Sequence, residues 1–149
     1  MAVNLKAPFL LTQAFGRHVA ERGGGGKVVN VLSSSLFRAA FISGPDYVAS
    51  KGGLLGLTRA CAAYLAELDV NVNAVAPGLT DTPRLHTPDI SDEERAARLE
   101  RAVAEGPMAN AFKRVSSPHD VAETIVFLCS PASRQITGQV VHTSAGAVV

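Results

Sequence analysis

The spacing of apolar residues divides this chain into alternating helices and short strands. Apolar side chains recur at helical intervals over residues 4–21 and again over 46–68, so each stretch predicts a helix. Two shorter runs, 27–32 and 70–76, are valine-rich and apolar, which is typical of strands buried in a parallel sheet. A third strand is predicted over 136–143.

Capping residues predict two further helices. Ser91 is followed three residues later by Glu94, the pattern of a reciprocal capping box at a helix start. Ser117 is the predicted cap of a helix over 118–129, with Asp120 in its first turn. The resulting order predicts an α/β fold: a βαβαβ unit with a preceding helix, in which three parallel strands carry helices on their faces.

Polar residues follow two of the predicted strands. Serines 33–35 come directly after the first strand, and Pro77 and Gly78 close the second. Tyr47 and Lys51 lie one helical turn apart at the start of the intervening helix. Because functional groups of parallel sheets gather at the carboxyl ends of the strands, we expect these residues to converge on one site.

Tyrosine and lysine in this spacing can carry proton transfer. A free tyrosine hydroxyl loses its proton only near pH ~10, and a neighbouring ammonium favours the phenolate. Tyr47 could then exchange a proton with an alcohol or carbonyl oxygen, while a nearby serine hydroxyl holds that oxygen in place. The pair alone is also common on solvated helices, so the flanking sequence decides between the two interpretations.

Three strings supply that flanking sequence: NVLSSS, YVASKGGLLGLTRACAAYLAEL and VNVNAVAPGLTDTP, in this order. Together they resemble the classical short-chain dehydrogenase/reductase family, and the resemblance runs over residues 3–146. It implies that 1–149 is a single partial domain, the C-terminal catalytic half of a Rossmann-type doubly wound sheet. The implied function is an NAD(P)-dependent oxidoreductase that interconverts a secondary alcohol and a ketone.

The resemblance also implies catalytic roles. Tyr47 is the implied acid/base, and Lys51 favours its ionised form and hydrogen-bonds the nicotinamide ribose. Asn4 matches a family asparagine that helps hold a water on the lysine's proton relay, although asparagine is also a preferred helix N-cap. Counting forward from the first strand gives Ser33 as the substrate-orienting serine, whereas counting back from Tyr47 gives Ser34. A one-residue loop insertion explains the difference and slightly favours Ser33.

Four residues after the second strand are implied to bind NAD or NADP. Pro77 and Gly78 would line the nicotinamide, the Thr80 backbone would meet its carboxamide, and Thr82 could reach the phosphates. Residues 79–106 are predicted to form a lid over a small-molecule alcohol or ketone.

The nucleotide-binding strands of the family have no counterpart in this sequence. No Gly-x-x-x-Gly-x-Gly turn follows a predicted strand, and the glycine run 23–26 ends a helix instead. We therefore expect upstream coding sequence for that half. This chain alone is expected to be inactive, to bind no cofactor at ordinary concentrations, and to be poorly soluble because strand 27–32 forms an open edge. Two alternatives are a non-catalytic fragment that associates with full-length subunits and an epimerase or dehydratase of the extended branch.

The composition of the chain limits the kinds of partner that we expect it to bind. A net charge of +1 gives no strong attraction to nucleic acid or an anionic membrane, and no signal peptide or membrane-spanning run is evident. Cys61 and Cys129 fall in apolar helical patterns, and two buried thiols without an export signal favour the cytoplasm. The four histidines are scattered, so no metal site is predicted.

Helix 46–68 carries apolar or small residues on nearly all of its sides, which predicts that the complete protein is a homodimer or homotetramer.

Overall fold

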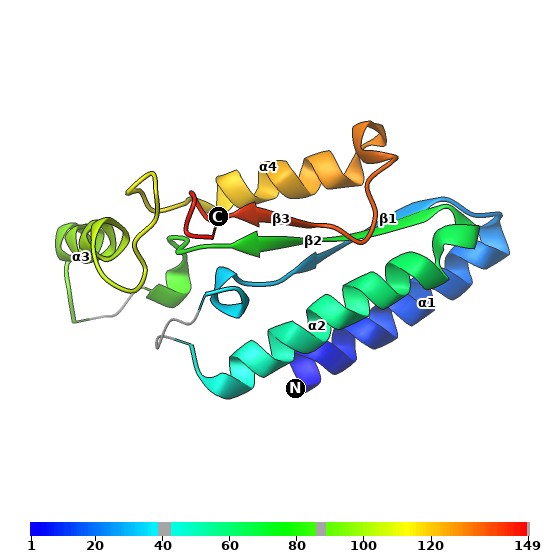
Figure 1. The fold of residues 1–149 in the computed structure, drawn as a ribbon, viewed down its shortest axis with the longest axis horizontal. Coiled ribbons are helices and arrows are strands. Elements are labelled where there is room, and N and C mark those ends of the chain that lie inside the picture. The colour runs from blue at the N-terminus through cyan, green and yellow to red at the C-terminus, as the bar shows by residue number, and fades with distance from the viewer. Residues whose placement is uncertain (39–42, 86–88, 149) are drawn as a thin grey trace.

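A three-stranded parallel sheet forms the centre of the protein, with strand order β1-β2-β3 (Figure 1). The computed structural model describes residues 1–38, 43–85 and 89–148. Its main elements are α1 (Ala7–Arg22), β1 (Gly26–Val31), α2 (Pro45–Tyr64), β2 (Val70–Pro77), α3 (Asp92–Ala104), α4 (Pro118–Cys129) and β3 (Val140–Thr143). Helices α1 and α2 cover one face and α4 the other, so the predicted βαβαβ arrangement with a preceding helix is confirmed.

The central strand β2 supplies most of the core. It pairs with β1 from Gly26↔Val70 to Val31↔Val75, and β3 joins its second half. Val72, Val75 and Ala76 are fully buried. On the other side of β1 no strand pairs with it within the described ranges, and Val31 keeps 43% of its surface exposed. The sheet therefore has an open edge at β1.

The first predicted helix has two parts with different geometry. A π-helical turn (Ala2–Lys6) leads into α1, with Pro8 in the first turn of α1, where its missing N–H costs no helix hydrogen bond. Gly16 and Val19 are buried in α1, but Leu11 of the predicted apolar pattern is 71% exposed. Helical spacing identified the helix but included two exposed residues, Phe9 and Leu11.

The third strand is shorter than the sequence predicts. It begins at Val140 rather than Ile136, because side-chain bonds replace the strand ladder before that point. The Asn73 amide donates to the Ile136 carbonyl (2.8 Å) and accepts from the Gln139 N–H (3.0 Å). Gly138 takes a left-handed conformation (φ 71°), which interrupts an extended strand.

We expect Asn73→Ala to destabilise the fold strongly. Asn73 is 1% exposed, and its removal leaves the Gln139 N–H without its partner and the Ile136 carbonyl with the bond from Asn71. An unsatisfied backbone group of this kind costs about 1–3 kcal/mol, and we expect a loss of roughly that size in the free energy of unfolding. Asn71→Ala is the matched control, since Asn71 also donates to Ile136 (3.0 Å) but lies partly exposed on the same strand. Equal losses in urea unfolding for the two variants would contradict this account.

Both predicted helix N-caps, Ser91 and Ser117, are confirmed, but the reciprocal capping box forms at the other helix. The Ser91 hydroxyl accepts from the Glu94 N–H (3.1 Å), but the Glu94 carboxylate accepts from Arg98 (2.7 Å), so only half of the predicted capping box forms. The reciprocal box occurs at α4, where the Ser117 N–H donates to Asp120 (2.6 Å) and the Asp120 N–H donates back to the Ser117 hydroxyl (3.3 Å). Hydrogen bonds from Ser117 lower the pKa of Asp120.

The two cysteines lie in different environments. Cys61 is half-buried, and burial raises the pKa of its thiol, whereas Cys129 is exposed at the last residue of α4. The prediction that both thiols are buried was therefore wrong for Cys129, because α4 reaches the surface where it ends. In the ranges that the structure describes, we find no helix with the length and apolar character needed to cross a membrane.

Candidate active site

A cavity of about 620 Å³ lies where β1 and β2 end. Eight of the nine predicted site residues line it: Ser33, Ser34, Tyr47, Lys51, Pro77, Gly78, Thr80 and Thr82. Residues from three separate parts of the chain are thus brought together at the carboxyl ends of parallel strands.

Helix α2 positions the tyrosine and lysine. It begins at Pro45, a residue preorganised for a first helical turn, and this places Tyr47 and Lys51 on the same side, four residues apart. The Lys51 ammonium nitrogen lies 5.7 Å from the centre of the Tyr47 ring and donates to the Val31 carbonyl (2.8 Å). Desolvation by burial lowers the pKa of Lys51. A positive charge is therefore held between the tyrosine and the end of β1.

Asn4 lies behind the cavity and does not line it. Its predicted alternative as a helix N-cap was wrong, because the π-helical turn starts at Ala2 and already includes Asn4. The Asn4 amide donates to the Ser50 hydroxyl (3.1 Å), which itself donates to the Tyr47 carbonyl (2.7 Å). Asn4 therefore braces the first turn of α2, on which Tyr47 and Lys51 are carried.

The serines after β1 form a short 3-10 turn, Ser34–Leu36. The Ser33 hydroxyl caps this turn by accepting from the Ser35 N–H (3.2 Å), which leaves its own O–H able to donate. The Ser34 hydroxyl has no hydrogen bond within the described residues. The predicted one-residue insertion falls in the loop 33–45, and residues 39–42 of that loop lie outside the described ranges.

Residues 79–82, which we name the 79–82 wall, form the side of the cavity after β2. Leu79 and Asp81 pair with Ser116, since the Ser116 N–H donates to the Leu79 carbonyl (3.0 Å) and the Asp81 N–H donates to the Ser116 carbonyl (2.9 Å). In this parallel bridge the N–H and C=O of Thr80 point away from Ser116, and neither has a backbone partner within the described part of the chain. They remain available to a ligand.

Gly78 is required at the base of this wall for a steric reason. A Cβ atom at this position would lie 3.0 Å from the Ser144 Cα, so any side chain would push the ends of β2 and β3 apart. Ser144 is 2% exposed and packs directly against this glycine.

Three apolar residues line the cavity from segments that the sequence analysis did not assign to the site: Met108, Pro118 and Val121. Leu85 also lines it and belongs to the predicted lid. Pro118 and Val121 belong to the start of α4, a helix that capping signals did predict, but nothing in the sequence indicated that it borders the site. Met108 carries no local signal, because its place depends on how the loop after α3 returns to the sheet.

Comparisons with known proteins agree with this arrangement. A family model described as enoyl-(acyl carrier protein) reductase matches residues 1–148. The chain is 35% identical over 149 residues to 2-dehydro-3-deoxy-D-gluconate 5-dehydrogenase of Escherichia coli (strain K12), covering 98% of this chain and 54% of that enzyme. The chain belongs to the short-chain dehydrogenase/reductase family.

Solved structures show the same fold with bound nucleotides. A protein of Agrobacterium tumefaciens with bound NADP is 36% identical, with a TM-score of 0.76, over 99% of this chain and 56% of its own. A 4-hydroxyisoleucine dehydrogenase complexed with NADH and succinate is 27% identical, with a TM-score of 0.77, over 98% of this chain and 56% of its own. The chain thus spans about half the length of the relatives it matches.

Proposed function

We propose that this chain is the catalytic half of an NAD(P)-dependent oxidoreductase that interconverts a secondary alcohol and a ketone. The observation that carries the proposal is the Lys51 ammonium, held 5.7 Å from the Tyr47 ring at a cavity that Ser33 and Ser34 also line. Relatives of this chain are named as dehydrogenases, and two related structures contain NADP or NADH, which supports the same chemistry here.

The residues at the cavity fit a nicotinamide. Thr80 offers a backbone N–H and C=O that have no backbone partner among the described residues, and these are the donor and acceptor that a carboxamide needs. The Lys51 ammonium can donate to a ribose hydroxyl. Pro77 and Gly78 would line the ring, and Thr82 could donate to a phosphate. When bound, NAD or NADP supplies the hydride acceptor or donor for the reaction.

Proton transfer is the task of the chain itself. In ketone reduction the Tyr47 hydroxyl donates its proton to the carbonyl oxygen, and a serine O–H holds the same oxygen in place. The Lys51 ammonium stabilises the phenolate left behind, while the Val31 carbonyl fixes the ammonium. In alcohol oxidation the phenolate accepts the proton instead.

The test is nicotinamide-dependent turnover of a panel of ketones and secondary alcohols. The assayed protein, which we name the two-part enzyme, joins residues 1–149 to the part of the Escherichia coli relative that lies outside the matched region. We expect oxidation of NADH or NADPH by at least one ketone. Turnover with no net change in nicotinamide absorbance would favour an epimerase or dehydratase, and a folded protein without any turnover would favour a non-catalytic fragment.

The two serines can be separated in the same assay. We propose Ser33 as the substrate-orienting residue and expect Ser33→Ala to lower kcat about 10²-fold, as loss of one donor to a reacting oxygen does. Ser34→Ala is the matched control and should keep most of the activity, since its hydroxyl neighbours the site without the same role. The opposite ranking would assign the role to Ser34 and place the loop insertion before it.

We also propose a homodimer or homotetramer for the whole protein. Phe9, Leu10 and Leu11 of α1 are exposed (45%, 47% and 71%), which gives this helix an apolar outer face beside α2. An apolar face of this kind needs a partner surface to exclude water.

A further inference from the structure

We propose that Arg95 is a positioning residue that fastens helix α3 to the 79–82 wall through Asp81, so that ligand binding at the wall and the placement of α3 are coupled. The inference rests on the proposed function for its ligand, a nicotinamide nucleotide or carbonyl substrate in the cavity. It concerns a residue that the catalytic mechanism above does not use.

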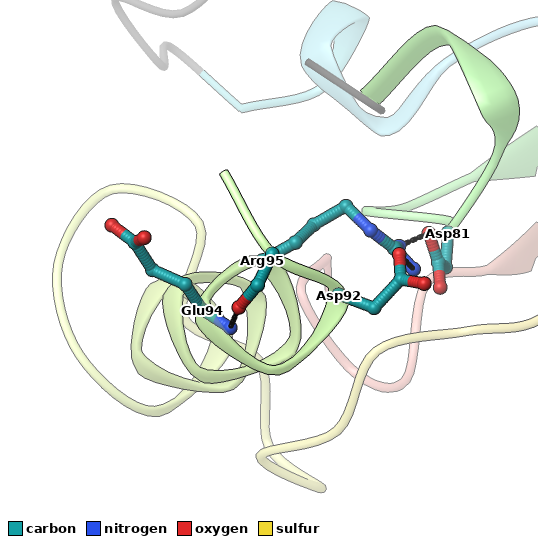
Figure 2. A network of polar contacts seen from close by, with 5 residues as sticks. Asp81, Asp92, Glu94 and Arg95 are labelled. Atoms are coloured by element: carbon teal, nitrogen blue, oxygen red, sulfur yellow. Dashed lines mark hydrogen bonds and ion pairs between the residues drawn. The ribbon is translucent and has the colours of Figure 1, made fainter. Parts of the chain in front are cut away.

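The contact joins two parts of the predicted lid that are separated in the chain. The Arg95 side chain extends from α3 to Asp81, with Asp92 beside it (Figure 2). The guanidinium donates to a carboxylate oxygen of Asp81 and to one of Asp92 (3.3 Å). Only 14% of the Arg95 side chain is exposed, whereas 42% of the Asp81 side chain is, so the ion pair is shielded from water on the arginine side.

Asp81 transmits this contact to the cavity. It stands between Thr80 and Thr82, both of which line the cavity, and its own N–H is bonded to Ser116. A displacement of the Asp81 side chain would therefore also move the backbone of Thr80, which we expect to bind the carboxamide. The hydrogen bond to Asp81 is also the main reason that the pKa of Arg95 is raised.

Among the described residues, helix α3 has few other attachments near its start. Figure 1 shows it beyond the ends of the strands, apart from the sheet and from the helices on its faces. Among the described residues, its only buried side chain is Val103, which lies near the opposite end of the helix. Within the described residues Arg95 is thus the strong contact of the first two turns, and its loss removes the positive charge that α3 places beside Asp81.

Arginine suits this role because its planar fork can serve two carboxylates at once, which a lysine ammonium does less well. Arg98, one turn later on the same helix, provides a matched control. It bonds only Glu94 within α3 (2.7 Å), and 62% of its side chain is exposed. The two arginines share a helix and a charge but differ in their contact with the wall.

The first test uses the 149-residue chain without ligand and measures amide hydrogen exchange. We expect Arg95→Ala to speed exchange in the first two turns of α3 by about tenfold or more, because local opening there loses its main restraint. Arg98→Ala should leave exchange in α3 unchanged, and Arg95→Lys should be intermediate. Unchanged exchange in β2 serves as the check that each variant folds. Equal exchange in Arg95→Ala and Arg98→Ala would overturn the proposal.

The second test measures coupling in the two-part enzyme. We expect Arg95→Ala to raise the cofactor Kd and the substrate KM about tenfold, within the usual range of coupling free energies, with a smaller change in kcat. Bound cofactor should also slow exchange in α3 of the unaltered enzyme but not in Arg95→Ala. If kcat alone falls, or if binding is unaffected, the coupling is wrong. If the unaltered two-part enzyme lacks turnover, the proposed function is contradicted. The exchange experiment without ligand still tests whether Arg95 holds α3 to the 79–82 wall.

Discussion

Replacement of Tyr47 by phenylalanine is expected to abolish nearly all turnover of the two-part enzyme while cofactor binding stays almost intact. The ring keeps its place on α2 and its distance from the Lys51 ammonium, so only the proton donor is lost. Loss of a general acid–base group typically costs about 10² to 10⁴ in rate, and no other cavity side chain described above offers a comparable acid. The measurement is kcat for ketone reduction, together with a fluorescence titration of NADH and NADPH.

The chain provides an internal control for this substitution. It contains only two tyrosines, and the second, Tyr64, is 85% exposed at the far end of the same helix. Tyr64→Phe should therefore leave kcat and cofactor binding unchanged. Retained turnover in Tyr47→Phe would remove the tyrosine from the mechanism, and loss of cofactor binding in that variant would indicate damage to the fold instead.

Replacement of Lys51 by alanine is expected to impair both turnover and cofactor binding. In our proposal its ammonium stabilises the phenolate that Tyr47 becomes in the reaction and also donates to the ribose, so the substitution removes two functions at once. A hydrogen bond to a charged group contributes about 1.5–3 kcal/mol, which corresponds to a loss of roughly 10- to 100-fold in cofactor affinity. We expect kcat at saturating cofactor to fall by about 10² or more, because the phenolate then lacks its neighbouring charge.

Lys27 is the matched control for this lysine. It lies at the other end of β1, where its ammonium donates to Asn71, away from the cavity. Lys27→Ala should alter neither kcat nor cofactor affinity. If Lys51→Ala lowers only affinity, with kcat unchanged once cofactor saturates, then the lysine binds the ribose without assisting the tyrosine.

Local sequence patterns were sufficient to predict those features of the site that depend on a single helix or strand. Apolar spacing located α2, and its start alone fixes Tyr47 and Lys51 on the same side of that helix. The valine-rich runs located β1 and β2, whose carboxyl ends then had to meet because parallel strands align them. Most of the candidate site followed from these two features together.

Sequence patterns did not predict features that depend on a side chain from a distant part of the sequence. The bonds from Asn73 to residues before Val140 shorten β3, and they depend on a buried side chain more than sixty residues earlier. The contact between Arg95 and Asp81 depends likewise on how α3 turns back over the chain. No periodicity within either segment reports such a contact. The same limit applies to the bridge between Thr80 and Ser116.

The parallel connections of the sheet also have a consequence for how this protein folds. Lys27 and Asn71, on paired strands β1 and β2, are 44 positions apart in the chain, and Asn73 and Gln139 are 66 apart. Chain entropy must be lost over these long loops before any inter-strand bond compensates for it, which makes such topologies slow to form. Tyr47 lies on the crossover between β1 and β2, so the cavity is complete only after both strands have paired. A refolding chain should accordingly regain its helical signal well before it regains its site.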